Sequence, residues 1–158
     1  MIIERDLEFR GSKGCAVFRT LFDTGATYSC IRPQCAETIA IMESLPDPLD
    51  VETASQGSYL SGGPAAGLRI EQAARLDFYI DGLRLTDEFM VVPGLSEQAI
   101  IGANTLQKWK IKLDFEHDAV ITAPRSAKLK LMVARRAIYK SPYRLVQDQY
   151  LKTVDPGK

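Results

Sequence analysis

Hydrophobic and polar residues alternate in short runs through the first three quarters of the chain, with turn residues between the runs. A period of two is typical of β-strands that bury one face. Leu76, Phe78 and Ile80 form the clearest run, and the Asp81-Gly82 pair after it is typical of a two-residue hairpin turn. The runs predicted as strands are residues 2–9, 15–23, 28–31, 75–80, 83–92, 99–101, 110–115 and 119–122.

Helical signals are few. Residues 33–41 begin with a proline, which fits the first position of a helix, and predict one or two helical turns. Residues 104–109 predict a short helix. Many short strands with turns between them indicate an all-β domain with a closed, barrel-like sheet. The length of 158 residues fits one such domain, which we place at residues 1–124.

Charge divides the chain at the same point. Residues 1–124 hold 11 Lys and Arg against 18 Asp and Glu, whereas residues 125–158 hold 9 against 2. In this basic C-terminal extension, the residue pattern predicts a strand or helix at 128–133 and an amphipathic helix from Ser141-Pro142 onward. Its aromatic residues do not alternate with its basic ones as single-strand nucleic-acid binding requires, so we expect the helix to dock on its own protein.

Several classes of function are disfavoured by composition. No apolar run approaches the roughly 20 residues needed to span a bilayer, and the N-terminus has no apolar signal segment, so we expect a cytoplasmic protein without membrane contact. Cys15, Cys30 and Cys35 lack metal-ligand spacing and only His117 could assist them. We therefore expect no metal, no cofactor and no cysteine nucleophile.

The candidate chemistry lies where the second predicted strand ends, in Asp23-Thr24-Gly25. An acid on a tight loop at a strand end is partly shielded from water and held in a fixed direction, as acid–base chemistry on an amide requires. Gly25 can supply a backbone conformation or a close approach that a residue with a Cβ would resist. By itself the tripeptide is also an ordinary turn sequence.

A second motif strengthens the functional interpretation. Asp23-Thr24-Gly25-Ala26 resembles the active-site motif of retropepsin-type (retroviral-like) aspartic proteases, and Ile100-Ile101-Gly102-Ala103-Asn104 resembles the segment that packs behind the active-site loop in that family. The resemblance spans about residues 9–121 and indicates a non-viral member. It implies that Gly102 and Asn104 support the active-site loop.

The same resemblance implies a mechanism and a partner. Aspartic proteolysis uses two carboxylates that share a proton, and this chain has one such motif, so the second Asp23 must come from another copy in a homodimer. Thr24 is expected to hold the two loops together and Gly25 to bond substrate. The peptide substrate is expected to contact Ala26 and Thr27, together with a mobile flap at Gly57, Ser58, Tyr59 and Leu60.

One departure from the viral pattern affects two positions together. Viral members commonly pair an acid two residues after Asp-Thr-Gly with an arginine after the second glycine, and here those positions are Thr27 and Ala103. Because both charges are absent, no unpaired buried charge remains. The departure leaves the fold prediction intact.

Two other functions fit parts of the sequence. A catalytically silent retropepsin-like dimer used for binding or assembly would keep the fold without cleavage, although such members usually lack the acid. Asp23-Thr24-Gly25-Ala26-Thr27 also resembles a phosphate loop of sugar kinases and actin-like ATPases. That fold normally needs more than twice this length and a second phosphate loop. The sequence favours an aspartic endopeptidase.

Overall fold

The computed structural model describes residues 2–51 and 68–123. The predicted flap residues Gly57 to Leu60 and the C-terminal extension lie outside the described residues. Chain contacts separate residues 1–128 from 129–158. The domain boundary at residue 124 stays a prediction.

Nine strands and two short helices make up the described part of the chain. They are β1 (Ile3–Arg10), β2 (Cys15–Phe22), β3 (Cys30–Ile31), α1 (Pro33–Ile39), β4 (Glu43–Val51), β5 (Leu68–Ile80), β6 (Leu83–Val91), β7 (Ala99–Ile101), α2 (Ala103–Trp109), β8 (Lys112–Asp114) and β9 (Ala119–Ile121). None of the described helices is long and apolar enough to cross a membrane.

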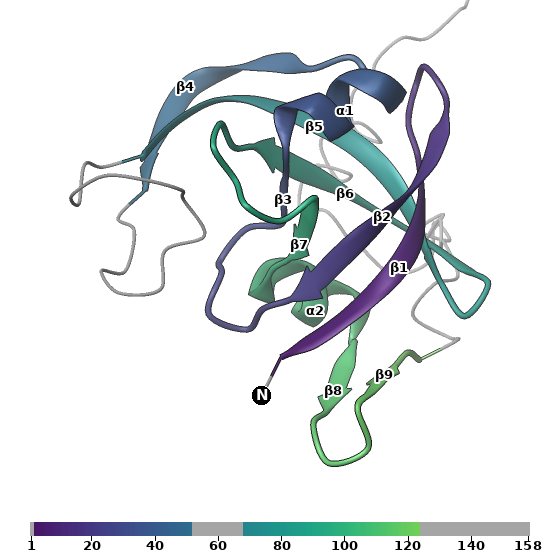
Figure 1. Cartoon of the computed structure of the whole chain (residues 1–158). Helices are drawn as coiled ribbons and strands as arrows, with labels where there is room; N and C mark the ends of the chain where they lie inside the picture. The colour runs from purple at the N-terminus through teal and green to yellow at the C-terminus, as the bar shows by residue number, and fades with distance from the viewer. Residues whose placement is uncertain (1, 52–67, 124–158) are drawn as a thin grey trace, which may run out of the picture. The chain divides into compact units, whose positions relative to one another are not determined.

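Six strands close into a barrel (Figure 1). Their order is β1-β2-β7-β3-β6-β5, and β5 returns to pair with β1 at Phe9 and Phe78. β2 runs antiparallel to β1 and parallel to β7, so it is bonded on both edges near its end. This closure confirms the predicted all-β, barrel-like architecture and places the end of β2 inside a rigid sheet.

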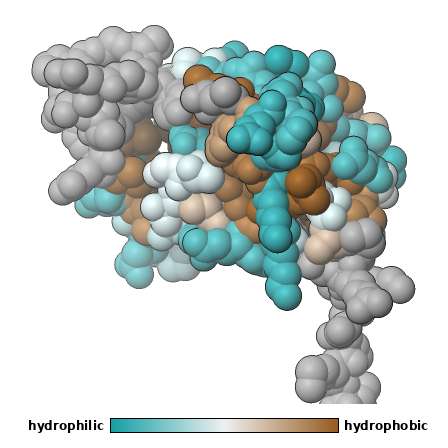
Figure 2. Space-filling model, turned by 90° about the horizontal axis from the view of Figure 1, so that it is seen from below, coloured by the Kyte–Doolittle hydropathy of each residue, from teal (hydrophilic) through white to brown (hydrophobic). Residues whose placement is uncertain are grey.

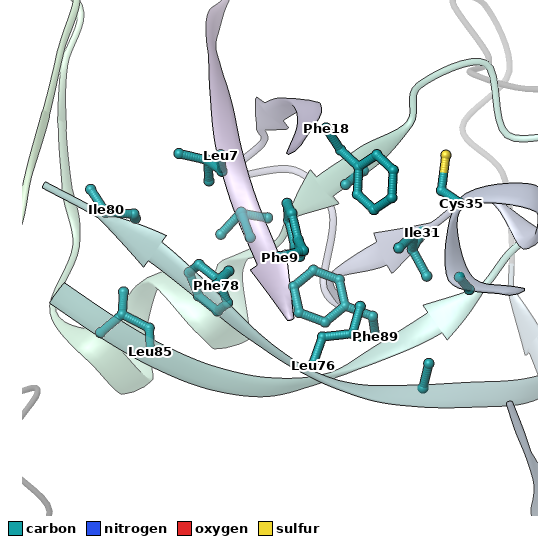
Figure 3. Close-up of a cluster of buried hydrophobic side chains, with 14 of the residues drawn as sticks. Leu7, Phe9, Phe18, Ile31, Cys35, Leu76, Phe78, Ile80, Leu85 and Phe89 are labelled. Atoms are coloured by element: carbon teal, nitrogen blue, oxygen red, sulfur yellow. The ribbon is translucent and has the colours of Figure 1, made fainter. Parts of the chain in front are cut away.

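Aromatic side chains fill the barrel (Figure 3). Phe9, Phe78 and Phe89 are fully buried, and each comes from a different strand. The Phe89 ring lies edge-on to both others, with centroids 5.5 Å from Phe9 and 5.8 Å from Phe78. Buried aromatic pairs of this geometry contribute roughly 0.5–1.5 kcal/mol beyond their burial. The inward-facing residues of the alternating runs therefore form the core, as the pattern predicted.

Local signals predicted most elements within a few residues. The hairpin turn at Asp81-Gly82 has positive φ at both residues, 49° and 77°, as its sequence predicts. Residues 33–39 form a helix that begins at the predicted proline and ends before the predicted end at residue 41.

The prediction missed β4 and the first half of β5. No strand was predicted for residues 43–51, which contain Pro46 and Pro48, but β4 continues through both prolines. It lies at the outer edge of the sheet, where proline is tolerated, and its register shifts between Ser44 and Leu49.

Candidate active site

Asp23 follows the last residue of β2 directly. Its backbone N–H donates a hydrogen bond of 3.0 Å to the carbonyl oxygen of Ile101, which continues the β2–β7 ladder by one residue. The side chain is half-buried, whereas Thr24 and Gly25 are exposed. The fold thus fixes the backbone of Asp23 and leaves the tip of its loop accessible.

The loop closes on the Asp23 carboxylate. The Gly25 N–H donates a hydrogen bond of 2.8 Å to Asp23 Oδ1, which orients the side chain. A Cβ added at Gly25 would lie 3.2 Å from that oxygen. Gly25 is not among the described residues with positive φ, so of the two expected reasons for glycine, close approach is the one that applies here.

The second motif packs directly behind this loop. A Cβ at Gly102 would lie 2.4 Å from the carbonyl oxygen of Tyr28 and 2.8 Å from that of Ala26, so no side chain fits. The next two amides bond the same loop, with Ala103 N–H donating to Ala26 at 2.7 Å and Asn104 N–H to Thr27 at 3.1 Å. Two segments far apart in sequence therefore form one unit.

The predicted site residues divide into three groups. Asp23, Gly102 and the Asn104 backbone meet at the Asp23 loop, although the Asn104 residue as a whole is exposed. Ala26 is half-buried and Thr27 is exposed, and their carbonyl oxygens accept the bonds from the Ala103 and Asn104 amides. Gly57, Ser58, Tyr59 and Leu60 lie outside the described residues.

A buried chain of hydrogen-bonded hydroxyl groups supports the segment behind the Asp23 loop, starting at the Gly102 amide. The sequence did not reveal it. Gly102 N–H donates to Ser29 Oγ at 3.0 Å, Ser29 Oγ lies 2.6 Å from Thr105 Oγ1, and Thr105 Oγ1 donates to Asp87 Oδ2 at 2.7 Å. Because a carboxylate only accepts, the Thr105 proton points to Asp87 and the Ser29 proton to Thr105. Lys108 Nζ bonds the other Asp87 oxygen at 3.1 Å.

This chain of bonds joins the loop, α2 and β6. Every buried side-chain nitrogen and oxygen in the described residues has a hydrogen-bond partner, so the polar atoms are satisfied. Sequence reasoning had no means to find it, because Ser29 and Thr105 are 76 residues apart and single hydroxyls carry no periodic signal.

Removing one hydroxyl should destabilise the domain. Thr105→Val removes the acceptor of the Ser29 hydroxyl proton and the donor to Asp87 Oδ2, so we expect a loss of about 1–3 kcal/mol in the free energy of unfolding. Thr38→Val is the control, since the exposed Thr38 hydroxyl bonds only the local Cys35 carbonyl. Urea unfolding measures both, and equal losses would contradict a structural role for the chain of hydroxyls.

An apolar cluster packs against the loop at Ala26. Its buried members are Leu21, Ile70, Ala73, Met90, Val92, Leu95 and Ile100, and the half-buried Ala26 and Cys30 pack against it. The Asp23 loop therefore packs against hydrophobic side chains through Ala26.

Cys30, which packs against this apolar cluster, has a thiol of low reactivity. Burial raises the pKa of the Cys30 thiol to about 12, and the negative charge of Asp23 adds to the rise. The thiol thus stays protonated at neutral pH, and the thiolate is the reactive form. We expect iodoacetamide at about pH 8 to alkylate the exposed Cys15 well before Cys30, as read by peptide mass spectrometry. Equal labelling rates would contradict this environment.

Within residues 2–51 and 68–123, no three His, Cys, Asp or Glu side chains lie close enough together to hold a metal ion. The arrangement offers a fixed carboxylate, a glycine-lined loop and an apolar wall.

Solved structures resemble this architecture, although no protein-family model and no curated protein sequence matches the chain. The retroviral protease-like domain of Ddi1 from Leishmania major aligns with a TM-score of 0.55 at 14% identity, over 77% of this chain and 88% of that one. The fold is retropepsin-like. EIAV protease in complex with the inhibitor HBY-793 aligns with a TM-score of 0.45 at 14% identity, over 73% of this chain and 94% of that one.

The retropepsin-like fold places both sequence motifs at one site. Thr27 and Ala103, the two positions that depart from the viral pattern, take part only through backbone groups in the bonds described above. The loop of this chain is held by glycine packing, backbone amides and the Ser29–Thr105–Asp87 hydroxyl chain, without an ion pair at those two positions.

Proposed function

We propose that the chain is a homodimeric aspartic endopeptidase in which the two Asp23 carboxylates face one water molecule. The observation that carries the proposal is the rigid presentation of Asp23, which is bonded to Ile101 through its backbone and to Gly25 through its carboxylate. Fixed geometry of this kind is what general acid–base catalysis requires.

The second carboxylate has to come from another copy. Asp-Thr-Gly occurs once in the sequence, and a two-fold axis beside the exposed Thr24 would bring two equivalent loops together. Two close carboxylates share one proton, so one is ionised and the other protonated. The monomer alone would lack the site.

The reaction then needs only water and peptide. The ionised Asp23 takes a proton from the water, whose oxygen attacks the carbonyl carbon of the scissile bond. The protonated Asp23 of the other copy donates its proton to the amide nitrogen, the C–N bond breaks, and an acid and an amine leave. No covalent enzyme intermediate forms, and the water oxygen remains in the acid product.

The substrate class follows from the surroundings of the loop. Extended peptides bind proteases of this architecture as an added strand, and we expect Ala26, Thr27 and the predicted flap at Gly57 to Leu60 to contact one. The half-buried Ala26 and Cys30, which pack against the apolar cluster, favour hydrophobic side chains next to the scissile bond. We propose cytoplasmic proteins as the substrates.

Digestion of a diverse peptide mixture from acidic to neutral pH tests the proposal. We expect cleavage at hydrophobic sites, and inhibition by a transition-state mimic that carries a hydroxyl at the scissile position. The rate should fall where both carboxylates of the pair are protonated and where both are ionised. A folded dimer that cleaves nothing and binds no mimic would favour the catalytically silent alternative.

A further inference from the structure

The loop between β6 and β7, residues 92–98, shares an apolar cluster with the Asp23 loop. Its Leu95 side chain is buried in the cluster against which Ala26 packs. Strand β4, which ends shortly before the predicted flap, contributes side chains to the same cluster. The β6–β7 loop therefore shares its apolar contacts with the Asp23 loop and with the strand before the flap.

Apolar surface alone does not define a substrate site on this molecule. Seen from below the view of Figure 1, apolar surface is interspersed with hydrophilic side chains (Figure 2), as on most folded proteins. A surface that selects one substrate side chain over another also has to stay in a fixed position. The bonds that hold the β6–β7 loop therefore decide whether Leu95 can act in this way.

The β6–β7 loop begins with a tight turn and then bonds another segment. The Leu95 N–H donates a hydrogen bond of 3.3 Å to the carbonyl oxygen of Val92, and Gly94 between them has a φ of 77°, which favours glycine. Beyond this turn, the carbonyl oxygens of Leu95, Ser96 and Gln98 all accept hydrogen bonds from one residue, Arg32.

Arg32 makes these bonds with its backbone and its side chain together. Its backbone N–H donates to Gln98 at 3.0 Å, and its Nε donates to the Leu95 carbonyl at 3.0 Å. A terminal nitrogen of the same guanidinium donates to the Ser96 carbonyl. The planar guanidinium presents its donors in a fixed fork, and charged donors form stronger hydrogen bonds than neutral ones. Two neighbouring carbonyl groups of the loop are therefore held by one side chain.

The backbone of Arg32 is itself held by the barrel and by α1. Arg32 follows the last residue of β3, and its carbonyl oxygen accepts hydrogen bonds of 3.0 Å from the N–H groups of Cys35 and Ala36 in the first turn of α1. The side chains of Cys35 and Ala36 are buried in the core. The guanidinium thus reaches the β6–β7 loop from a rigid starting point.

We propose that Arg32 is a positioning residue that holds the β6–β7 loop in place beside the substrate and so determines, through Leu95, which hydrophobic side chain a substrate carries there. This role rests on the proposed function. The Asp23 loop is held by other bonds, from Gly25 and from the start of α2. Arg32 therefore affects substrate binding and selectivity and leaves the chemical step unchanged.

Arg32→Lys tests the bonds to the loop without removing the positive charge. Lysine has a single nitrogen at its tip and cannot reproduce the fork to Leu95 and Ser96. We expect hydrogen–deuterium exchange at the amides of residues 94–98 to become about 10-fold faster or more, while exchange in β2 stays unchanged.

Arg84→Lys is the matched control for this change. Arg84 is exposed on β6 and donates to Asp77 Oδ2, a carboxylate that lysine can also pair with, so exchange in the β6–β7 loop should remain as in the wild type. Thermal melting checks that both variants are folded. Wild-type exchange rates in the loop of Arg32→Lys would show that Arg32 does not hold it.

Cleavage kinetics test the consequence for substrates, with peptides that differ in one hydrophobic residue beside the scissile bond. For the preferred peptide, Arg32→Lys should raise KM about 10-fold and keep kcat within about two-fold of the wild type. The ratio of kcat/KM between the preferred and the poorer peptide should fall towards one. A residue that only stabilised the fold would lower kcat for all peptides alike. Unchanged selectivity in a variant whose loop exchanges faster would overturn the role.

Leu95→Val shows whether Arg32 acts through Leu95. Removing one methylene from Leu95 should change the preference between the two peptides by about 10-fold in the wild-type background. In the Arg32→Lys background the same substitution should have a clearly smaller effect, because a loosely held side chain discriminates less. Equal effects in both backgrounds would contradict a path through Leu95.

The outcomes separate this role from the proposed function. A wild type that cleaves peptides, with an Arg32→Lys variant of the same selectivity, overturns the role of Arg32 and leaves the peptidase proposal standing. A wild type that cleaves no peptide contradicts the proposed function and the selectivity role together. In that case the exchange measurement still decides whether Arg32 holds the β6–β7 loop.

Discussion

Asp23→Asn is expected to reduce peptide cleavage by about 10³-fold or more and to leave the fold and the dimer intact. The amide has the shape of the carboxylate, and its oxygen can still accept the 2.8 Å hydrogen bond from the Gly25 N–H. It cannot take a proton from water or return one to the leaving amine. The loss is therefore chemical rather than structural.

Asp81→Asn is the matched control for this variant. It makes the same change of carboxylate to amide in the β5–β6 turn, where φ is 49° and asparagine is well accepted. Cleavage rates, thermal melting and sedimentation should be measured for both. Full activity of Asp23→Asn would contradict the mechanism, and loss of folding would show that Asp23 is a structural acid.

Gly102→Ala should have the largest effect on the position of the loop. The added Cβ would lie 2.4 Å from the Tyr28 carbonyl oxygen and 2.5 Å from its carbon, and backbone atoms cannot rotate aside. The Asp23 loop or the start of α2 must move, breaking the bonds from Ala103 and Asn104. We expect a loss of about 3 kcal/mol in the free energy of unfolding and a larger loss of cleavage than stability alone explains.

Gly14→Ala is the control for the change of glycine to alanine. A Cβ at Gly14 meets nothing within 4 Å, so this variant should be as stable as the wild type or slightly more stable. Urea unfolding and cleavage assays compare the two. If Gly102→Ala unfolds at the same urea concentration as Gly14→Ala and cleaves normally, the close packing behind the loop does not support the site.

The backbone of the site could be predicted from the sequence because a glycine marks each position where two backbone segments, or a backbone and a side chain, lie too close for a Cβ. Gly25 and Gly102 are positions where a side chain would touch its neighbours, and Asp81-Gly82 marks a turn with positive φ, so each could be interpreted from a few residues. Alternating apolar residues likewise predicted the strands that carry the barrel core.

Interactions between distant positions were not predictable in this way. The Ser29–Thr105–Asp87 hydroxyl chain depends on three residues from the start of β3, from α2 and from β6. In sequence, none of them differs from ordinary surface residues. β4 was missed because proline usually ends a strand, and only its edge position in the sheet explains why Pro46 and Pro48 are tolerated.

The central claim is that each active site takes one Asp23 from each of two copies. Its most direct test mixes a fixed amount of wild type with an equal amount of Asp23→Asn, well above the dimer dissociation constant, and allows subunits to exchange. Half-wild-type dimers hold one carboxylate, so cleavage should fall to about half of its value without the variant. Unchanged cleavage after full exchange would show that one Asp23 suffices, and would contradict the shared site.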